Sequence, residues 1–238
     1  MVCAFIVMKC ERFSQITDLK DYLENNRLIA HYCGFNIMKP LPSYWTYDRF
    51  LKEVDNGELK NIMAQQVKKL YELGIVDASF IGLDSTPVAA NTKQNNPKSF
   101  AKDKFKPENH PKADPDCALG VHSASNQHNE RRYEFYWGYK NHVLVDCISG
   151  LPLYELTTPA NVADSSVVQN ILAAANKTLP LQECTFLGDK GYDVKAIYDL
   201  VKNVYQGDAV IPLNKRNTKD PEKLPAGRPP KSLCKRQK

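Results

Sequence analysis

A chain of 238 residues with 42% apolar and 25% charged residues can bury a full hydrophobic core, and its net charge of +5 is too low for a chain that stays unfolded. The 11 glycines and 15 prolines follow no period, which excludes a collagen-like chain, and no apolar run of about 18 residues predicts a membrane span. The apolar residues 1–8 lack a basic n-region and a small-residue cleavage site, so they do not predict a signal peptide.

The first 76 residues predict a small helical region. Apolar side chains spaced about one helical turn apart predict helices over 17–31, 46–54 and 58–73. Thr17 and Thr46 are the expected N-caps of the first two helices. Gly34 and Gly74 follow the first and third helices, where glycine is favoured.

Strand patterns begin after residue 77. Residues 79–83 predict a buried strand that ends in a turn at 84–87. The polar, Lys-rich segment 91–132 is too long for an ordinary connection, so we expect an insertion or a functional loop. Residues 134–147 and 151–158 predict a hairpin, because Gly150 and Pro152 separate two alternating runs.

Helices and strands alternate after the hairpin. The pattern predicts a helix capped by Asp164, a strand at 185–188, a helix capped by Asp193 and a strand at 209–213. This order is a mixed α/β sheet of the ribonuclease-H-like type. We therefore expect a helical region over 1–76, a catalytic core over 77–213 with a basic insertion at 91–132, and a tail over 214–238.

Cysteine usage favours a reducing compartment. Seven cysteines occur at irregular spacing without a C-x-x-C pair. This is typical of free thiols in the cytoplasm and not of a disulfide scaffold or a zinc site. We expect Cys147 and Cys184 to behave as small buried hydrophobic side chains.

The positive charge belongs to the end of the chain. Residues 214–238 hold nine basic and two acidic residues, a net charge of +7, so residues 1–213 carry a net charge of −2. The tail also contains four prolines, and we expect it to be disordered. Such a segment either contacts phosphates or is a solvated tail without a partner.

Two aspartates occupy equivalent positions in this pattern. Asp84 and Asp189 each directly follow a short apolar run that predicts a strand. Carboxylates at the carboxyl ends of neighbouring strands point into one crevice, and hard oxygen ligands favour Mg²⁺ or Mn²⁺. The alternative is that both aspartates are local caps of turns or helices.

Four short motifs distinguish these alternatives. In chain order they are Ile81–Val88 (IGLDSTPV), Tyr139–His142 (YKNH), Asn161–Ser165 (NVADS) and Leu187–Asp193 (LGDKGYD). Together they resemble the core of the DDE transposases of bacterial insertion sequences, over roughly residues 18–217. The last motif is the most specific, since it closely matches the second catalytic-acid motif of that family.

The resemblance implies a ribonuclease-H-like fold and a specific chemistry. Asp84 and Asp189 would be the first two acids of the catalytic triad and would bind two divalent ions, Mg²⁺ or Mn²⁺. The enzyme would cut DNA at the element's ends and join the freed 3′-hydroxyl to target DNA. Lys140, Lys190 and Tyr192 would lie near the scissile phosphate; the alternative is that the lysines are simply exposed and the tyrosine is packed in the core. A homodimer is compatible with this interpretation, and no membrane partner is expected.

The sequence departs from the family in one respect. The third acid, a glutamate on a helix after the last strand, is not identifiable, since Glu222 lies in no helical context. We interpret the chain as the front portion of a transposase and expect little or no strand transfer by this chain alone. Two alternatives stay open: a catalytically dead DNA-binding remnant, and a metal-dependent nuclease of the same fold.

Overall fold

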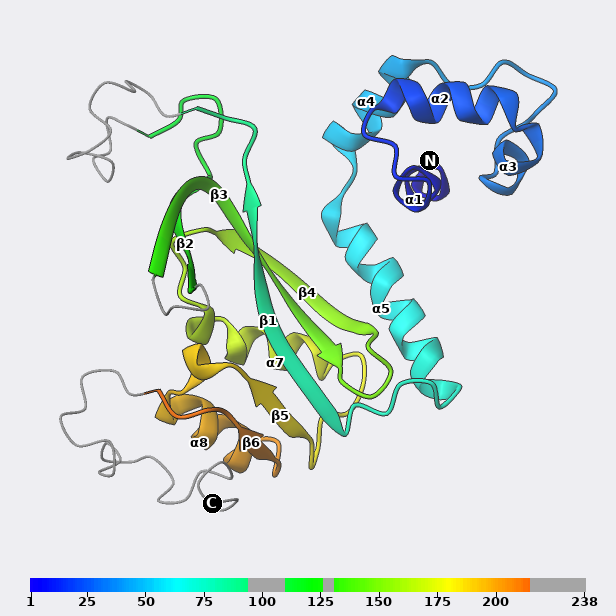
Figure 1. Ribbon diagram of the computed structural model, residues 1–238. Helices are drawn as coiled ribbons and strands as arrows, with labels where there is room; N and C mark the ends of the chain where they lie inside the picture. The colour runs from blue at the N-terminus through cyan, green and yellow to red at the C-terminus, as the bar shows by residue number, and fades with distance from the viewer. Residues whose placement is uncertain (94–109, 126–130, 215–238) are drawn as a thin grey trace. The chain divides into compact units, whose positions relative to one another are not determined.

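The computed structural model describes residues 1–93, 110–125 and 131–214 (Figure 1). The chain forms two compact units, Met1–Asn61 and Ile62–Lys238. The division lies earlier than the expected boundary at residue 76, because Val67 and neighbouring side chains of the last N-terminal helix pack in the core of the second unit. No helix within the described ranges is long and apolar enough to cross a membrane.

The first unit consists of helices. They are α1 (Val2–Cys10), α2 (Ile16–Asn25), α3 (Arg27–Tyr32), α4 (Tyr44–Glu53) and the beginning of α5 (Asn56–Glu72). Their core is a cluster of buried side chains: Ala4, Met8, Leu19, Leu23, Ala30, Cys33 and Tyr47.

The ends of these helices differ in part from the sequence prediction. The expected first helix is broken at Asn26, whose φ of −120° and ψ of 69° are not helical. Thr17 and Thr46 lie inside α2 and α4 instead of capping them, so both predicted N-caps are wrong. Gly34 and Gly74 follow α3 and α5 with φ of +84° and +68°, a backbone conformation that glycine adopts without a steric penalty.

The second unit contains a six-stranded sheet. Its strands are β1 (Phe80–Ala89), β2 (Ala118–Ser125), β3 (Arg131–Asp146), β4 (Pro152–Pro159), β5 (Thr185–Gly188) and β6 (Asp208–Val210). The order is β2-β3-β1-β5-β6, and β4 pairs with β3. β1, β5 and β6 are parallel to one another, and the pairs made by β3 are antiparallel.

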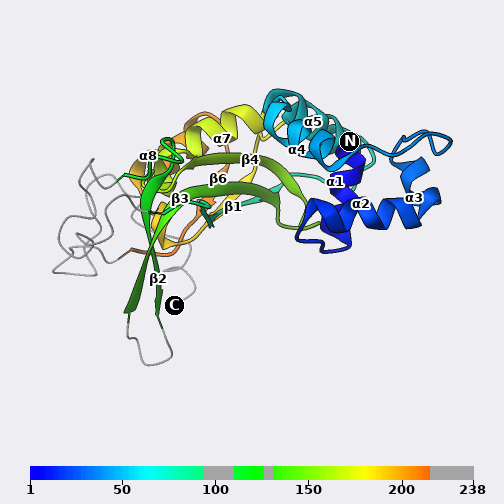
Figure 2. The same cartoon turned by 90° about the horizontal axis from the view of Figure 1, so that it is seen from above.

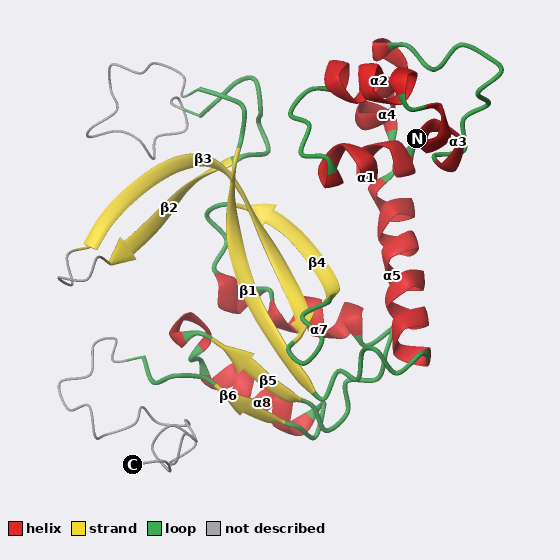
Figure 3. Cartoon of the chain, turned by 45° about the vertical axis from the view of Figure 1, so that its right-hand side comes forward, coloured by secondary structure: helices red, strands yellow, loops and turns green. Residues whose placement is uncertain are grey.

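The long strand β3 changes its partner along its length. Its first half pairs with β2, and its second half pairs with β4 in the predicted hairpin (Figure 3). β1 pairs with the other edge of β3 from Gly138 to Asp146. The path β4-β3-β1-β5-β6, with three antiparallel strands followed by two parallel ones, is the sheet of the ribonuclease-H-like fold.

Three local predictions need correction. β1 does not turn at Asp84 but continues to Ala89, because β3 pairs with it over that whole length. The segment 91–132 is not only a loop, since it contains β2, while residues 94–109 and 126–130 lie outside the described residues. Cys184 is buried as expected, whereas Cys147 is exposed.

Helices cover one face of the sheet. α7 (Val168–Ala175) and α8 (Lys195–Asn203) lie on the same side of it (Figure 2). Ile81 and Leu83 of β1 are buried on this side, in one cluster with residues of both helices. Because side chains alternate along a strand, Gly82 and Asp84 point to the opposite face.

Candidate active site

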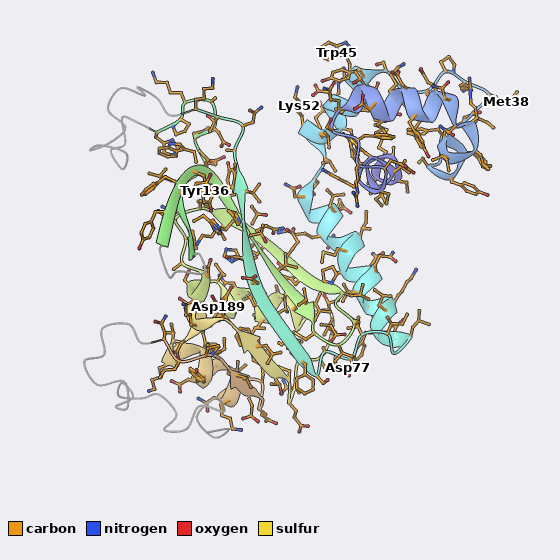
Figure 4. The ribbon with its side chains drawn as sticks, in the orientation of Figure 1. Met38, Trp45, Lys52, Asp77, Tyr136 and Asp189 are labelled. Atoms are coloured by element: carbon orange, nitrogen blue, oxygen red, sulfur yellow. The ribbon has the colours of Figure 1, made fainter. Side chains whose placement is uncertain are left out.

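Asp84 lies within β1, and Asp189 directly follows the neighbouring strand β5. The last pair in register between β1 and β5 is Leu83 with Gly188, so the two aspartates occupy the next position on each chain. Neighbouring strands are about 4.8 Å apart. Both side chains are exposed, and Figure 4 shows Asp189 at the end of β5. Two carboxylates this close repel each other unless a cation lies between them.

A backbone N–H group holds one oxygen of each carboxylate. The N–H of Ser85 donates to Oδ1 of Asp84, with 2.8 Å between nitrogen and oxygen, and that of Gly191 donates to Oδ1 of Asp189 at 2.6 Å. A Cβ at position 191 would lie 2.8 Å from the same Oδ1, so glycine permits this approach. Among the described residues, nothing donates to the second oxygen of either carboxylate, which leaves it accessible to a ligand.

Asp189 also begins the short 3-10 helix η4 (Lys190–Tyr192) as its N-cap. The alternative that Asp189 is the local cap of a turn is therefore correct for one of its two carboxylate oxygens, Oδ1. Asp193, predicted to cap α8, instead accepts hydrogen bonds from the hydroxyl of Tyr198 at 3.1 Å and from the N–H of Asn214 at 2.6 Å. The side chain of Asn214 donates to the carbonyl of Lys190 at 2.8 Å, so the end of the described chain fixes this turn.

Tyr192 is buried beside the acidic residues. Its side chain is 2% exposed and packs edge-on against Phe186, with 6.2 Å between ring centroids. Its hydroxyl has no hydrogen-bond partner within the described part of the chain. Burial raises the pKa of this phenol, and the negative charges of Asp164, Asp84 and Asp189 raise it further. The hydroxyl therefore remains protonated at neutral pH.

A second polar cluster centres on Asp164, in the 3-10 turn η3 (Asp164–Ser166). Its Oδ1 accepts hydrogen bonds from Oγ of Ser85 and Nζ of Lys140, both at 3.0 Å. Nζ of Lys140 also donates to the carbonyl of Val162 at 3.0 Å. The predicted N-cap role of Asp164 is wrong, because its side chain binds residues of β1 and β3 and makes no capping hydrogen bond.

His142 lies behind this cluster and is 0% exposed. Its Nε2 is 2.9 Å from Oγ1 of Thr158, and its Nδ1 is 3.8 Å from Oδ1 of Asp164. Burial lowers the pKa of this imidazole, Asp164 opposes the shift, and Lys140 adds to it. Sequence reasoning missed His142 and Ser85 as site residues, although Lys140 and His142 lie on the same face of β3 as the buried Leu144.

A sequence model described as "Transposase DDE domain" matches residues 68–238. The chain belongs to the DDE transposase family. The resemblance carried by the four motifs is thereby confirmed, and DDE transposases use divalent metal ions. Among curated proteins, none matches the chain.

Solved transposase structures resemble the chain at low sequence identity. One is the piggyBac transposase synaptic complex with hairpin DNA, at 11% identity and a TM-score of 0.44, covering 96% of this chain and 45% of that chain. Another is the Mos1 transposase paired-end complex with left transposon end, at 13% identity and a TM-score of 0.30, covering 87% of this chain and 56% of that chain. The DDE transposase chain thus spans about half the length of these proteins.

The predicted site residues of this DDE transposase form two groups. Asp84, within β1, lies near Asp189 and Tyr192, which follow the end of β5. Lys140 is held by Asp164 and is 19% exposed. Lys190 follows Asp189 directly, and its exposed side chain forms no ion pair with any described residue.

The donor set of Asp84 and Asp189 fits a hard divalent cation. Mg²⁺ is commonly bound by one or two carboxylates while it keeps several waters, and Asp84 and Asp189 offer two. No group of three His, Cys, Asp or Glu side chains in the described ranges could hold a metal ion. Glu222, considered for the third acid, lies outside the described residues.

Proposed function

We propose that this DDE transposase cleaves phosphodiester bonds of DNA and joins strands during transposition, with divalent ions held by Asp84 and Asp189. The observation that carries the proposal is that each aspartate directly follows a member of the last in-register pair of the parallel strands β1 and β5, Leu83 and Gly188. When bound, two such ions stabilise the attacking and leaving oxygens of a phosphodiester displacement.

The chain's own groups have distinct parts in this proposal. The N–H groups of Ser85 and Gly191 fix one oxygen of each aspartate, so the other oxygen would be available to hold an ion. Lys190, exposed next to Asp189, binds a phosphate of the DNA backbone. Tyr192 retains its proton and packs against Phe186 of β5, the strand that Asp189 follows, so its part is structural support. Lys140 of β3, held by Asp164, adds positive charge on the face of the sheet opposite to the side chain of Asp84.

Transposon ends and target DNA are the proposed substrates. The similar piggyBac and Mos1 structures are complexes with hairpin DNA and with a transposon end. The described residues offer two carboxylates for the metal where the family uses three. We therefore expect weak metal binding, slow nicking of DNA and little or no strand transfer by this chain.

Metal binding tests the proposal directly. Calorimetric titration with Mn²⁺ should detect binding by the wild-type chain. Asp84→Asn and Asp189→Asn should each weaken it by about tenfold or more, because a charged ligand is removed. Asp199→Asn, which removes an exposed carboxylate from α8, is the matched control and should bind Mn²⁺ like the wild type.

A nicking assay on supercoiled plasmid distinguishes the alternatives. Slow Mn²⁺-dependent nicking that Asp189→Asn abolishes supports the proposal. Salt-sensitive DNA binding without Mn²⁺ binding or nicking would instead identify a DNA-binding protein without catalytic activity. Rapid nicking that both aspartate variants retain would refute any role for this site.

A further inference from the structure

The side chain of Asp164 connects the two polar clusters of the site. Its Oδ1 accepts the hydrogen bond from Oγ of Ser85 at 3.0 Å, and the backbone N–H of Ser85 donates to Oδ1 of Asp84 at 2.8 Å. Ser85 therefore contacts Asp164 through its side chain and Asp84 through its backbone. Because side chains alternate along β1, these two contacts lie on opposite faces of the sheet.

Asp164 reaches Ser85 from a distant part of the chain. The two residues are 79 positions apart, and η3 brings Asp164 against the buried face of β1 and β3. Asp164 is 33% exposed, and its ion pair with Lys140 holds its carboxylate in place from a second strand. Fixing Oγ of Ser85 restrains the peptide that presents its N–H to Asp84.

We propose that Asp164 is a positioning residue for the metal site, which acts through Ser85 to orient the carboxylate of Asp84. The inference rests on the proposed metal-binding role of Asp84. Groups that orient the ligands of a metal, without touching the metal, commonly change its affinity by 10- to 100-fold. No contact of Asp164 with the metal is required.

The chemistry of the contact predicts which substitutions matter. Asp164→Ala removes the acceptor for Oγ of Ser85 and weakens Mn²⁺ binding by about tenfold. Ser85→Ala keeps the backbone N–H but removes the same hydrogen bond, so it weakens Mn²⁺ binding by a similar factor. Asp164→Asn retains an amide oxygen as acceptor and restores the affinity to within about threefold of wild type.

The experiment is Mn²⁺ titration of these variants and of the double variant Asp164→Ala/Ser85→Ala. If both residues act through one hydrogen bond, the double variant binds Mn²⁺ like either single variant. Asp114→Ala is the matched control, because it removes a carboxylate that accepts the hydroxyl hydrogen of Tyr139 at 2.6 Å, and it should leave Mn²⁺ affinity unchanged. Thermal unfolding reports whether each variant is folded.

The outcomes separate this inference from the proposed function. Failure of the wild-type chain to bind Mn²⁺ overturns the proposed function and this inference with it. Normal Mn²⁺ binding by folded Asp164→Ala or Ser85→Ala overturns only the positioning role. Additive decreases in the affinity of the double variant also overturn it, because they show that the two residues act separately. If Asp164→Ala does not fold, Ser85→Ala and Asp164→Asn decide the question.

Discussion

His142 couples the stability of the fold to pH. Its imidazole is fully buried, with Lys140 and Asp164 as the charged groups facing it, and burial lowers its pKa below the ordinary value of 6.5. The unfolded chain therefore binds a proton at a higher pH than the folded chain does. The neutral form of His142 therefore contributes fully to the free energy of unfolding above pH 6.5. This contribution is lost as the pH falls toward the lowered pKa of the folded state.

This predicts a specific effect of His142→Gln. As the pH falls below 6.5 toward the lowered pKa, the unfolding free energy of the wild type should decrease by up to about 1.4 kcal/mol per pH unit from this group. Urea unfolding at several pH values should show that the Gln variant lacks this component. His122→Gln, at an exposed position of β2, should follow the wild type. Parallel curves for wild type and His142→Gln would contradict the buried neutral imidazole.

The role of Asp164 shows the limit of sequence reasoning at single residues. Its position before a helical pattern predicts an N-cap, because capping depends only on neighbours along the chain. The observed partners, Ser85 and Lys140, come from β1 and β3. Asp84 and Asp189 could be placed near each other from the sequence, since each follows a strand-like run and the two runs pair in parallel, although β1 continues beyond Asp84.

At the scale of elements, Gly138 lies where β3 changes its partner. It is in register with Ala89 of β1 and with Ala118 of β2. A Cβ at this position would lie 2.1 Å from the carbonyl oxygen of Val88 and 2.9 Å from the backbone nitrogen of Ala90. Backbone atoms cannot move away as a flexible side chain can, so the sheet would have to shift.

Gly138→Ala should therefore destabilise the second unit by about 1–3 kcal/mol, the usual cost of inserting a methyl group into a packed site. Urea unfolding followed by circular dichroism measures this decrease. Gly57→Ala is the matched control, since the nearest atom to its Cβ is a side-chain oxygen of Asp55 at 3.2 Å. Its stability should stay within about 1 kcal/mol of wild type. Equal stability of Gly138→Ala and wild type would show that this strand crossing is not tightly packed.

The extent of β1 and β2 also depends on partners that the local sequence does not reveal. Residues 84–87 have the composition of a turn, yet they remain extended because β3 runs beside them. β2 has few strand-forming residues at its end, and its pairing with β3 overrides that weak local preference. The hairpin of β3 and β4 was predictable, because alternation and Gly150 determine it locally.

At the scale of the whole molecule, the positive charge is confined to the end of the chain. Neither the first compact unit nor residues 62–213 of the second unit carry a net positive charge. Residues 1–61 contain eight basic and eight acidic residues, so residues 62–213 hold 15 basic and 17 acidic ones. All of the excess positive charge lies in residues 214–238, with nine basic and two acidic residues. Non-specific DNA affinity depends on the number of phosphates that basic groups neutralise.

A chain that ends at Asn214 should therefore bind DNA less tightly and with a weaker dependence on salt. It retains the hydrogen bonds of Asn214 with Asp193 and Lys190, so the turn after Asp189 stays fixed. Fluorescence anisotropy with a DNA duplex at several salt concentrations gives the slope of log K against log salt. The slope should decrease by about 0.9 for each phosphate that the shortened chain no longer neutralises.

A full-length variant with all nine basic tail residues replaced by Gln is the matched control for chain length. It should bind DNA like the shortened chain, because the effect depends on charge and not on the presence of the segment. If the shortened chain kept the wild-type affinity and slope, the tail would not bind phosphates. The basic residues of segment 91–132, eight against five acidic ones, would then be the main source of DNA affinity.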